Sequence, residues 1–140
     1  GLDLWCSDDG ALAEETYWPK EGVRGHKRLW NGDEKTVREE EVWGPGKGSI
    51  SREWNARGRL RRGFPRFFLD GREGRKVTKR QYLQACQEDP SLPSYRPEDD
   101  NPHRELPAEY LAQRERRGGR RGGGGPRRRS SAAGVCRLAD

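Results

Sequence analysis

Tryptophan residues recur along the first half of this chain at a nearly constant spacing. Trp18, Trp30, Trp43 and Trp54 are separated by 12, 13 and 11 residues, and a segment rich in Gly, Asn or Pro follows each of them. Segments of strand length that alternate with turns at this spacing are typical of an antiparallel meander. The steps of 25 and 24 residues from Trp5 to Trp30 and on to Trp54 also indicate a repeat of two strands.

Turn chemistry and charge support the same interpretation. Asn31-Gly32 is the strongest single hairpin signal, because a type I′ turn needs positive φ at both central positions. An aromatic residue ahead of each turn would occupy the same level of successive strands, so we predict a ladder of rings on one sheet face as the core. The basic segment 24–28 and the acidic segment 39–41 are expected to pair across strands and to fix their register.

A helix is predicted over residues 78–88. Thr78 is the expected N-cap, and Gln81, three residues later, completes a capping box. Three residues share one face of this helix: Tyr82, Ala85 and Cys86. We expect this face to cover the end of the sheet near Phe64, Phe67 and Phe68, where it would protect an open edge.

Beyond this helix, the composition changes twice. Residues 91–107 hold four prolines and are expected to form an extended strap with Leu92 and Tyr95 as anchors. A short helix is predicted over residues 108–117, because Pro107 is suited to a first helical position. From residue 118 onward the chain is rich in Arg and Gly and is predicted to be disordered.

The composition limits how large a core this chain can form. Only 29% of the 140 residues are hydrophobic and 37% are charged, yet 5 Trp, 4 Tyr and 3 Phe argue that part of it folds. Residues 1–111 hold 20 Lys and Arg against 21 Asp and Glu, a net charge of −1, whereas residues 112–140 hold 9 Arg and 2 acids. The basic character therefore belongs to the tail.

The Arg/Gly tail resembles segments that bind single-stranded nucleic acid through guanidinium groups. One alternative is that the tail is only a solubilising arm. Another is that it arose by drift or a frameshift, because GC-rich DNA encodes runs of Arg, Gly, Pro and Ala in almost any reading frame. The alternative function is thus an RNA- or DNA-binding accessory protein acting through its tail. The candidate residues are Arg116, Arg117, Arg120, Arg121, Arg127, Arg128 and Arg129.

No catalytic or metal-binding constellation emerges from the sequence. His26 and His103 are 77 residues apart and have no Cys or carboxylate at ligand spacing. The stretch GPGKGS departs from a phosphate-binding loop because Lys47 is followed by Gly48 and a strand-like segment. We therefore predict a non-enzyme with no cofactor and no metal.

Three cysteines, Cys6, Cys86 and Cys136, lie far apart without any CxxC motif. Their odd number predicts reduced thiols and a cytoplasmic protein. No run of 18 apolar residues is present, so no membrane span is expected. The sequence contains no Met, even at position 1, as expected of a fragment that lacks its true start.

Two recurring units, EGVRGHKRLWNGDEK and GKGSISREWNARGRL, resemble bacterial MORN-repeat-variant proteins, a family often labelled antitoxin-like. The resemblance covers residues 10–75, with a third, shortened unit at its end. The matching positions are Gly25, Trp30, Asn31 and Gly32, then Gly48, Trp54, Asn55 and Gly58, then Phe68, Asp70 and Gly71. The resemblance implies stacked hairpins that serve as a binding scaffold, and the label implies an antitoxin or immunity role.

We therefore expect a mainly β protein, an antiparallel MORN-like meander of repeated hairpins with a capping helix and a disordered tail. The expected regions are a β-hairpin repeat sheet (1–75), a capping helix with strap and short helix (76–117), and the tail (118–140). The leading functional hypothesis is a protein–protein interaction scaffold that uses aromatic and charged residues of a sheet face to bind an unidentified protein. Adhesion to anionic lipid is a further alternative. The candidate protein-binding residues are Trp18, Trp30, Trp43, Trp54 and Phe68.

Overall fold

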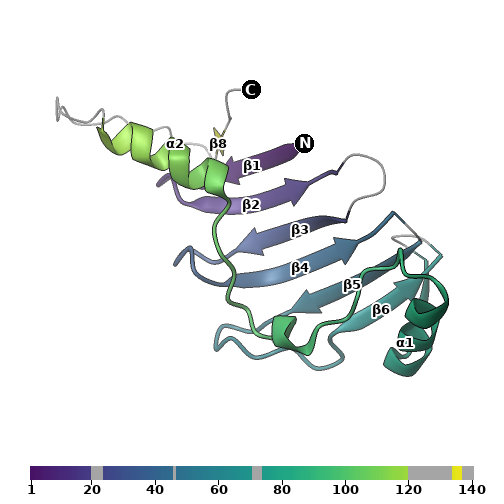
Figure 1. The fold of residues 1–140 in the computed structure, drawn as a ribbon. Helices are drawn as coiled ribbons and strands as arrows, with labels where there is room; N and C mark the ends of the chain where they lie inside the picture. Colours follow the sequence, from purple (N-terminus) through teal and green to yellow (C-terminus); the bar gives the residue numbers. More distant parts are fainter. Residues whose placement is uncertain (20–23, 46, 71–73, 120–133, 137–140) are drawn as a thin grey trace.

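A single antiparallel sheet dominates the computed structural model, which describes residues 1–19, 24–45, 47–70, 74–119 and 134–136. The strands are β1 (Leu2–Cys6), β2 (Leu12–Tyr17), β3 (Gly25–Trp30), β4 (Val37–Trp43), β5 (Gly48–Glu53), β6 (Arg66–Leu69), β7 (Arg75–Val77) and β8 (Gly134–Val135). Strands β1 to β7 follow one another as a meander, and β8 returns to pair with β1 (Figure 1). The predicted mainly β meander is confirmed.

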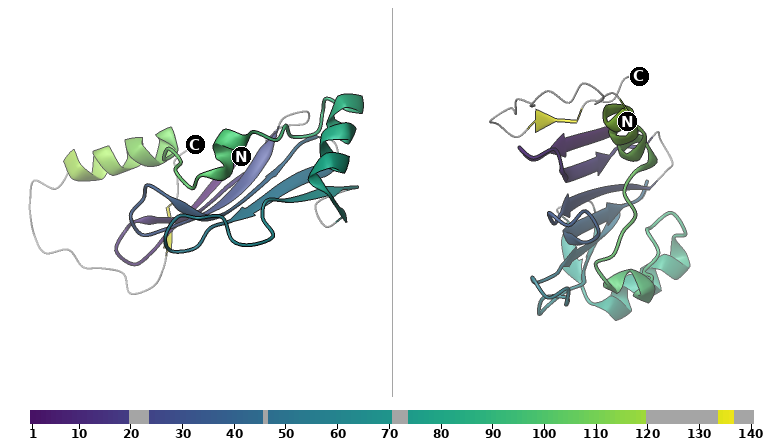
Figure 2. Two further views of the ribbon diagram at one scale, coloured as in Figure 1. Left: turned by 90° about the horizontal axis from the view of Figure 1, so that it is seen from below. Right: turned by 90° about the vertical axis from the view of Figure 1, so that its left-hand side faces the viewer.

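Two helices and a strap cover one face of this sheet (Figure 2). Helix α1 (Lys79–Glu88) begins with the predicted capping box of Thr78 and Gln81. The strap follows with a 3₁₀ turn, η1 (Pro97–Asp100), and leads to α2 (Ala108–Gly119). We call the side under these elements the covered face and the opposite side the open face. Within the described residues, no helix or strap segment packs on the open face.

The strand register assigns alternate side chains to the two faces. On the covered face, direct register neighbours form a row through Leu4, Glu15, Arg28, Glu40 and Arg52. Opposite charges therefore alternate from β2 to β5, and the pairing of Arg28 with Glu40 agrees with the predicted pairing of segments 24–28 and 39–41. Charged residues on a strand usually face solvent, but most of this row does not, since Glu15, Glu40 and Arg52 are buried.

Two apolar clusters lie on the covered face. One, beneath α2, contains Leu4, Cys6, Leu12, Trp30, Val37, Trp54, Tyr110 and Cys136. The other, beneath α1, contains Ile50, Phe67, Val77, Tyr82 and Leu92. The Phe67 and Tyr82 rings lie 5.2 Å apart, so the predicted packing of the helix on the sheet end is confirmed for Phe67. Phe64 and Phe68 are not part of this cluster. Leu92 is buried and Tyr95 is half-buried, as expected of strap anchors.

The predicted ladder of rings on a single face is wrong. Trp30 and Trp54 are 2% exposed in the core, whereas Trp5 is 45% exposed between two residues that point to the covered face. Because strand side chains alternate, a change of one residue in segment length moves a ring to the other face. The register also shifts between Trp5 and Cys6 and between Leu29 and Trp30.

The turn after β3 also differs from the prediction. The Asn31 amide donates to the Thr36 carbonyl at 2.9 Å, so the turn is wider than a two-residue type I′ turn. Positive φ occurs at Glu34 (57°) and not at Gly32. The Asp33 carboxylate accepts a hydrogen bond from the Thr36 amide at 3.0 Å and stabilises this wider turn.

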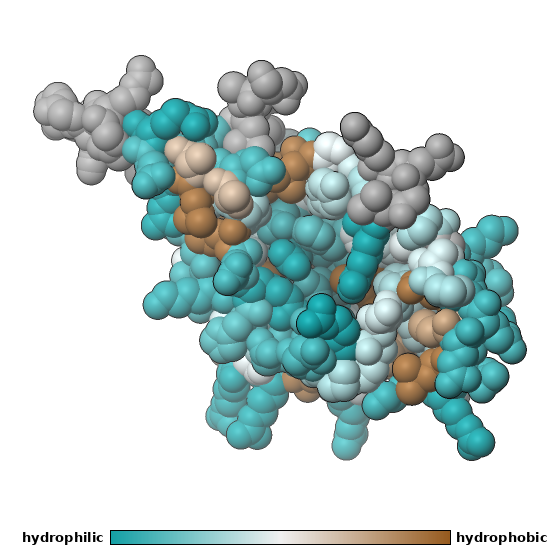
Figure 3. All heavy atoms as spheres, viewed as in Figure 1, coloured by the Kyte–Doolittle hydropathy of each residue, from teal (hydrophilic) through white to brown (hydrophobic). Residues whose placement is uncertain are grey.

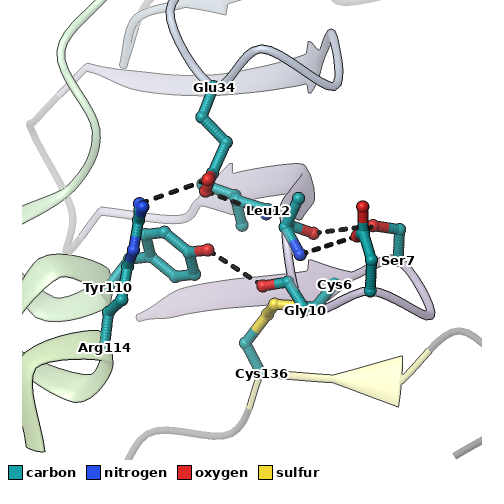
Figure 4. Close-up of a disulfide and its surroundings, with 10 residues drawn as sticks. Cys6, Ser7, Gly10, Leu12, Glu34, Tyr110, Arg114 and Cys136 are labelled. Atoms are coloured by element: carbon teal, nitrogen blue, oxygen red, sulfur yellow. Dashed lines mark hydrogen bonds and ion pairs between the residues drawn. A yellow bond between two sulfur atoms is a disulfide. The ribbon is translucent and has the colours of Figure 1, made fainter. Parts of the chain in front are cut away.

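Strand β8 is an ordered exception within the predicted disordered tail. Val135 pairs with Trp5 at the sheet edge, and Cys136 forms a disulfide with Cys6, with their Cα atoms 5.5 Å apart (Figure 4). The expectation of three reduced cysteines is therefore wrong, because the fold brings together residues that are 130 positions apart. Disulfides persist mainly in oxidising compartments, which is at odds with the expected cytoplasmic location.

Helix α2 is tied to the turns beside this disulfide. The Tyr110 hydroxyl donates to the Gly10 carbonyl at 2.9 Å, and Arg114 forms an ion pair with Glu34 at 3.2 Å (Figure 4). Glu34 also accepts a hydrogen bond from the Leu12 amide at 3.3 Å. These contacts hold α2 against the β1–β2 and β3–β4 turns, so both ends of the covered face are closed.

Candidate interaction surface

A row of aromatic residues crosses one end of the open face. Trp43 on β4 and Phe68 on β6 both pair with Ser49 on β5, which places the three side chains in one row. Trp18 and Gly1 exchange two backbone hydrogen bonds and so extend the β1–β2 ladder by one pair. Side chains alternate along a strand, so Trp18 faces the open side, opposite to Tyr17. Tyr17 pairs with His26, which places Trp18 opposite Gly25 and therefore in the same row as Trp43. We call Trp18, Trp43 and Phe68 the aromatic row.

A glycine makes this arrangement sterically possible. Gly25 pairs with Trp43 across β3 and β4, and a Cβ atom at this position would come within 2.6 Å of the Trp43 indole. It would also lie 2.9 Å from Cδ of Pro19, which directly follows Trp18. The indole of Trp43 therefore lies across the backbone of β3, where only glycine leaves space for it.

The members of the aromatic row differ in exposure. Trp18 is 47% exposed, and Trp43 and Phe68 are half-buried. The other two candidate protein-binding residues, Trp30 and Trp54, belong to the core of the covered face. Three of the five residues chosen from the sequence thus share one surface row, and two are out of reach of a partner in this fold.

Charged residues occupy the middle of the open face. A hollow of about 210 Å³ over β3 to β5 is lined by the open-face residues Lys27, Leu29, Glu39, Glu41 and Ser51, and also by Glu40 and Arg52, whose side chains point to the covered face. Glu39 lies directly opposite Glu53 in the register of β4 and β5. In the described part of the chain neither of these two carboxylates has an ion-pair partner. Like charges in directly opposed positions destabilise a strand pair.

The covered face, by contrast, is closed by a buried ionic network. Arg104 of the strap donates two hydrogen bonds of 2.9 Å to the Glu40 carboxylate, and Arg28 donates a third of 2.8 Å. On the next strand, Arg52 donates a hydrogen bond of 3.0 Å to the carboxylate of Asp100 in the strap. Burial raises the pKa of Glu40, but the hydrogen bonds and positive charges of Arg104 and Arg28 outweigh this effect and lower the pKa to about 2.

Glu15 and Trp54 complete the polar contacts beneath the strap. Glu15 accepts hydrogen bonds from His26 at 2.6 Å and from the Trp30 indole at 3.0 Å. The Trp54 indole donates to the Asp100 carbonyl at 2.7 Å. Each buried charge is paired, so this network stabilises the frame and offers no open group for a ligand. Sequence reasoning missed it because its strap residues are far from the strands in the sequence.

The surface above the strap is mainly hydrophilic, with separate apolar patches near α2 and α1 (Figure 3). The exposed large apolar residues on these helices are single leucines, Leu111 at 44% and Leu83 at 39%. Isolated exposed leucines are ordinary on a protein surface. Among the residues that the structure describes, this side therefore has no counterpart to the aromatic row.

Only two of the tail residues chosen as nucleic-acid ligands lie among the described residues. Arg116 is exposed on α2, and Arg117 lies within the same helix. The remaining residues, Arg120, Arg121 and Arg127 to Arg129, lie outside the described residues. The prediction that the tail binds nucleic acid stays a prediction.

Comparison with family models, with curated proteins and with solved structures finds no significant match to this chain. Among the described residues, no group of three or more His, Cys, Asp or Glu is placed to hold a metal ion. In the same part of the chain, no helix is both long and apolar enough to cross a membrane.

Proposed function

We propose that this chain is a non-enzymatic protein-binding scaffold whose contact surface is the open face of the sheet. The observation that carries this proposal is the aromatic row, in which Trp18, Trp43 and Phe68 lie on alternate strands of one register row on the face opposite the strap. Aromatic residues at the centre of a contact surface supply a large part of the binding energy in protein complexes. A buried ionic network closes the opposite face, which leaves the open face for a partner.

The charges of the open face suggest the chemistry of this partner. By the register, five acids and three bases point to this side: Asp3, Glu14, Glu39, Glu41 and Glu53 against Lys27, Arg66 and Lys76. A partner with an apolar patch and a net positive rim would complement both the aromatic row and the acids. The antitoxin-like role implied by the MORN-variant resemblance is one form of this function, with a basic toxin as the partner.

The proposal is tested with two matched alanine variants. Trp18→Ala removes the most exposed ring of the aromatic row, and Leu111→Ala removes a similarly exposed apolar side chain from α2. Full-length chains are used for affinity capture from native cells after nuclease treatment, followed by quantitative mass spectrometry. A protein captured by the wild type and by Leu111→Ala, but not by Trp18→Ala, supports the proposal. Equal capture by both variants overturns it.

A further inference from the structure

An arginine-rich connection leads from β5 into β6, and only its last residue, Arg66, is also one of the open-face bases of the proposed scaffold surface. Residues 55–66 contain five arginines and no acid, although residues 1–111 as a whole carry a net charge of −1. These arginines are Arg57, Arg59, Arg61, Arg62 and Arg66, and all five are exposed. Among the described residues, none of their guanidinium groups has an ion-pair partner. We call residues 55–66 the arginine loop.

Hydrogen bonds hold the arginine loop in a defined conformation. The Asn55 side-chain oxygen accepts from the Arg57 and Arg59 amides at 2.9 and 3.1 Å, and the Asn55 amide donates to the Arg59 carbonyl at 2.8 Å. A second turn follows, in which the Phe64 amide donates to the Arg61 carbonyl at 3.1 Å. Positive φ values at Gly58 and Gly63 permit the two turns.

The loop is also fixed to the core. Trp54 and Leu60 form an isolated bridge across its base, and Leu60 packs against the cluster that contains the buried Trp54 ring. The Arg61 amide donates to the Glu53 carbonyl at 2.8 Å. Gly58 approaches Pro102 of the strap, since a Cβ atom there would lie 3.4 Å from the proline ring. The arginines are therefore presented from a rigid base.

Five cations on one loop with an ordered backbone, and with no acid in the loop sequence, disfavour folding through repulsion and suit an anionic ligand. All five residues are arginine rather than lysine, and the planar guanidinium binds phosphate oxygens bidentately. The guanidinium carbon of one of the five, Arg66, lies 4.2 Å from the centre of the half-buried Phe64 ring. An aromatic ring next to a cationic strip is the combination that binds nucleotides by stacking and charge.

We propose that the arginine loop binds the phosphodiester backbone of a nucleic acid, with Phe64 as a stacking position for a base. This site is distinct from the Arg/Gly tail and from the aromatic row, so its failure would leave the scaffold proposal standing. Phosphate contacts make affinity depend steeply on salt through counterion release, which gives the site a measurable signature.

The test uses the full chain and fluorescence anisotropy with three labelled 20-nucleotide probes: single-stranded RNA, single-stranded DNA and a DNA duplex. A loop variant carries Arg59→Gln, Arg61→Gln and Arg62→Gln. A matched tail variant carries Arg127→Gln, Arg128→Gln and Arg129→Gln, which removes the same charge elsewhere. Circular dichroism melting confirms that both variants fold, and a third variant, Phe64→Leu, tests stacking.

The loop variant should weaken binding at least tenfold and reduce the slope of log K against log salt by about 2 to 3, because three phosphate contacts are lost. Phe64→Leu should weaken binding to single strands about tenfold without changing the salt slope. The three probes identify which strand form the site prefers. The proposal is overturned if the loop variant binds all probes like the wild type while the tail variant does not. It is also overturned if polyglutamate or anionic phosphatidylserine vesicles bind the loop as tightly as the oligonucleotides do.

Discussion

Arg104 in the strap binds Glu40 on the central strand β4 through two hydrogen bonds of 2.9 Å. The two residues are 64 positions apart, and their side chains are 9% and 3% exposed. Removing one member of a buried ion pair leaves the other charge without its partner. Arg104 therefore links the strap to the middle of the sheet and keeps the covered face closed.

The Arg104→Ala variant should lower the free energy of unfolding by about 3 kcal/mol, measured by urea denaturation. Arg96→Ala provides the matched control, because the Arg96–Glu98 pair lies in the same strap but is exposed. An exposed pair contributes little, so this control should unfold at nearly the wild-type urea concentration. Equal effects of the two variants would show that the strap is not held by its buried pair.

Stability should also depend on pH through Glu40. Its folded pKa of about 2 lies below the ordinary value of 4.5, so the ionised carboxylate stabilises the fold above pH 4.5 and this stabilisation is lost as the pH falls towards 2. The shift corresponds to about 3 kcal/mol. Unfolding of the wild type and of Glu40→Gln is compared between pH 6 and pH 2. The wild type should lose more stability than the variant, and parallel curves would contradict this assignment.

Features that depend on residues close together in the sequence could be predicted from it, whereas contacts between distant residues could not. The capping box of Thr78 and Gln81 is a local signal, and the helix that it starts was predicted at its observed position. The pairing of Arg104 with Glu40 has no local signal, because it depends on the path of the strap across the sheet. Prolines indicate an extended segment, but they do not indicate which strand it crosses.

The candidate surface shows the same limit. The spacing of the tryptophans predicted the strands correctly, but the face of each ring depends on segment length and on bulges. Trp30 and Trp54 are therefore core residues, whereas Trp18 and Trp43 lie on the open face. The disulfide between Cys6 and Cys136 could not be predicted from the sequence either, because it forms only once β8 has returned to pair with β1.

Loss of this disulfide should be costly. Replacing Cys136 with Ser opens a covalent loop that spans 130 residues, which should lower the free energy of unfolding by about 4 kcal/mol. Cys86→Ser is the control, because Cys86 is a free, half-buried thiol, and it should cost less than about 1 kcal/mol. Non-reducing peptide mapping of the wild type checks the bond itself. Detection of three free thiols in natively purified protein would refute it.

The backbone at Gly25 offers a test of the aromatic row that leaves its rings in place. Gly25→Ala adds a Cβ atom within 2.6 Å of the Trp43 indole, which must then move. We expect a changed near-ultraviolet circular dichroism spectrum and weaker capture of the partner. Gly10→Ala is a useful comparison, because no atom lies within 4 Å of its added Cβ, although its positive φ adds local strain. An unchanged spectrum for Gly25→Ala would show that Trp43 does not lie across β3.

The fold divides the tryptophans between the two faces of the sheet, and their reactivity towards hydroxyl radicals reports this division. Hydroxyl-radical labelling of the free, folded chain with mass spectrometric readout gives an oxidation rate for each tryptophan. This division predicts fast oxidation of Trp5 and Trp18, an intermediate rate for Trp43, and protection of Trp30 and Trp54. Oxidation of Trp30 or Trp54 as fast as that of Trp18 would contradict it.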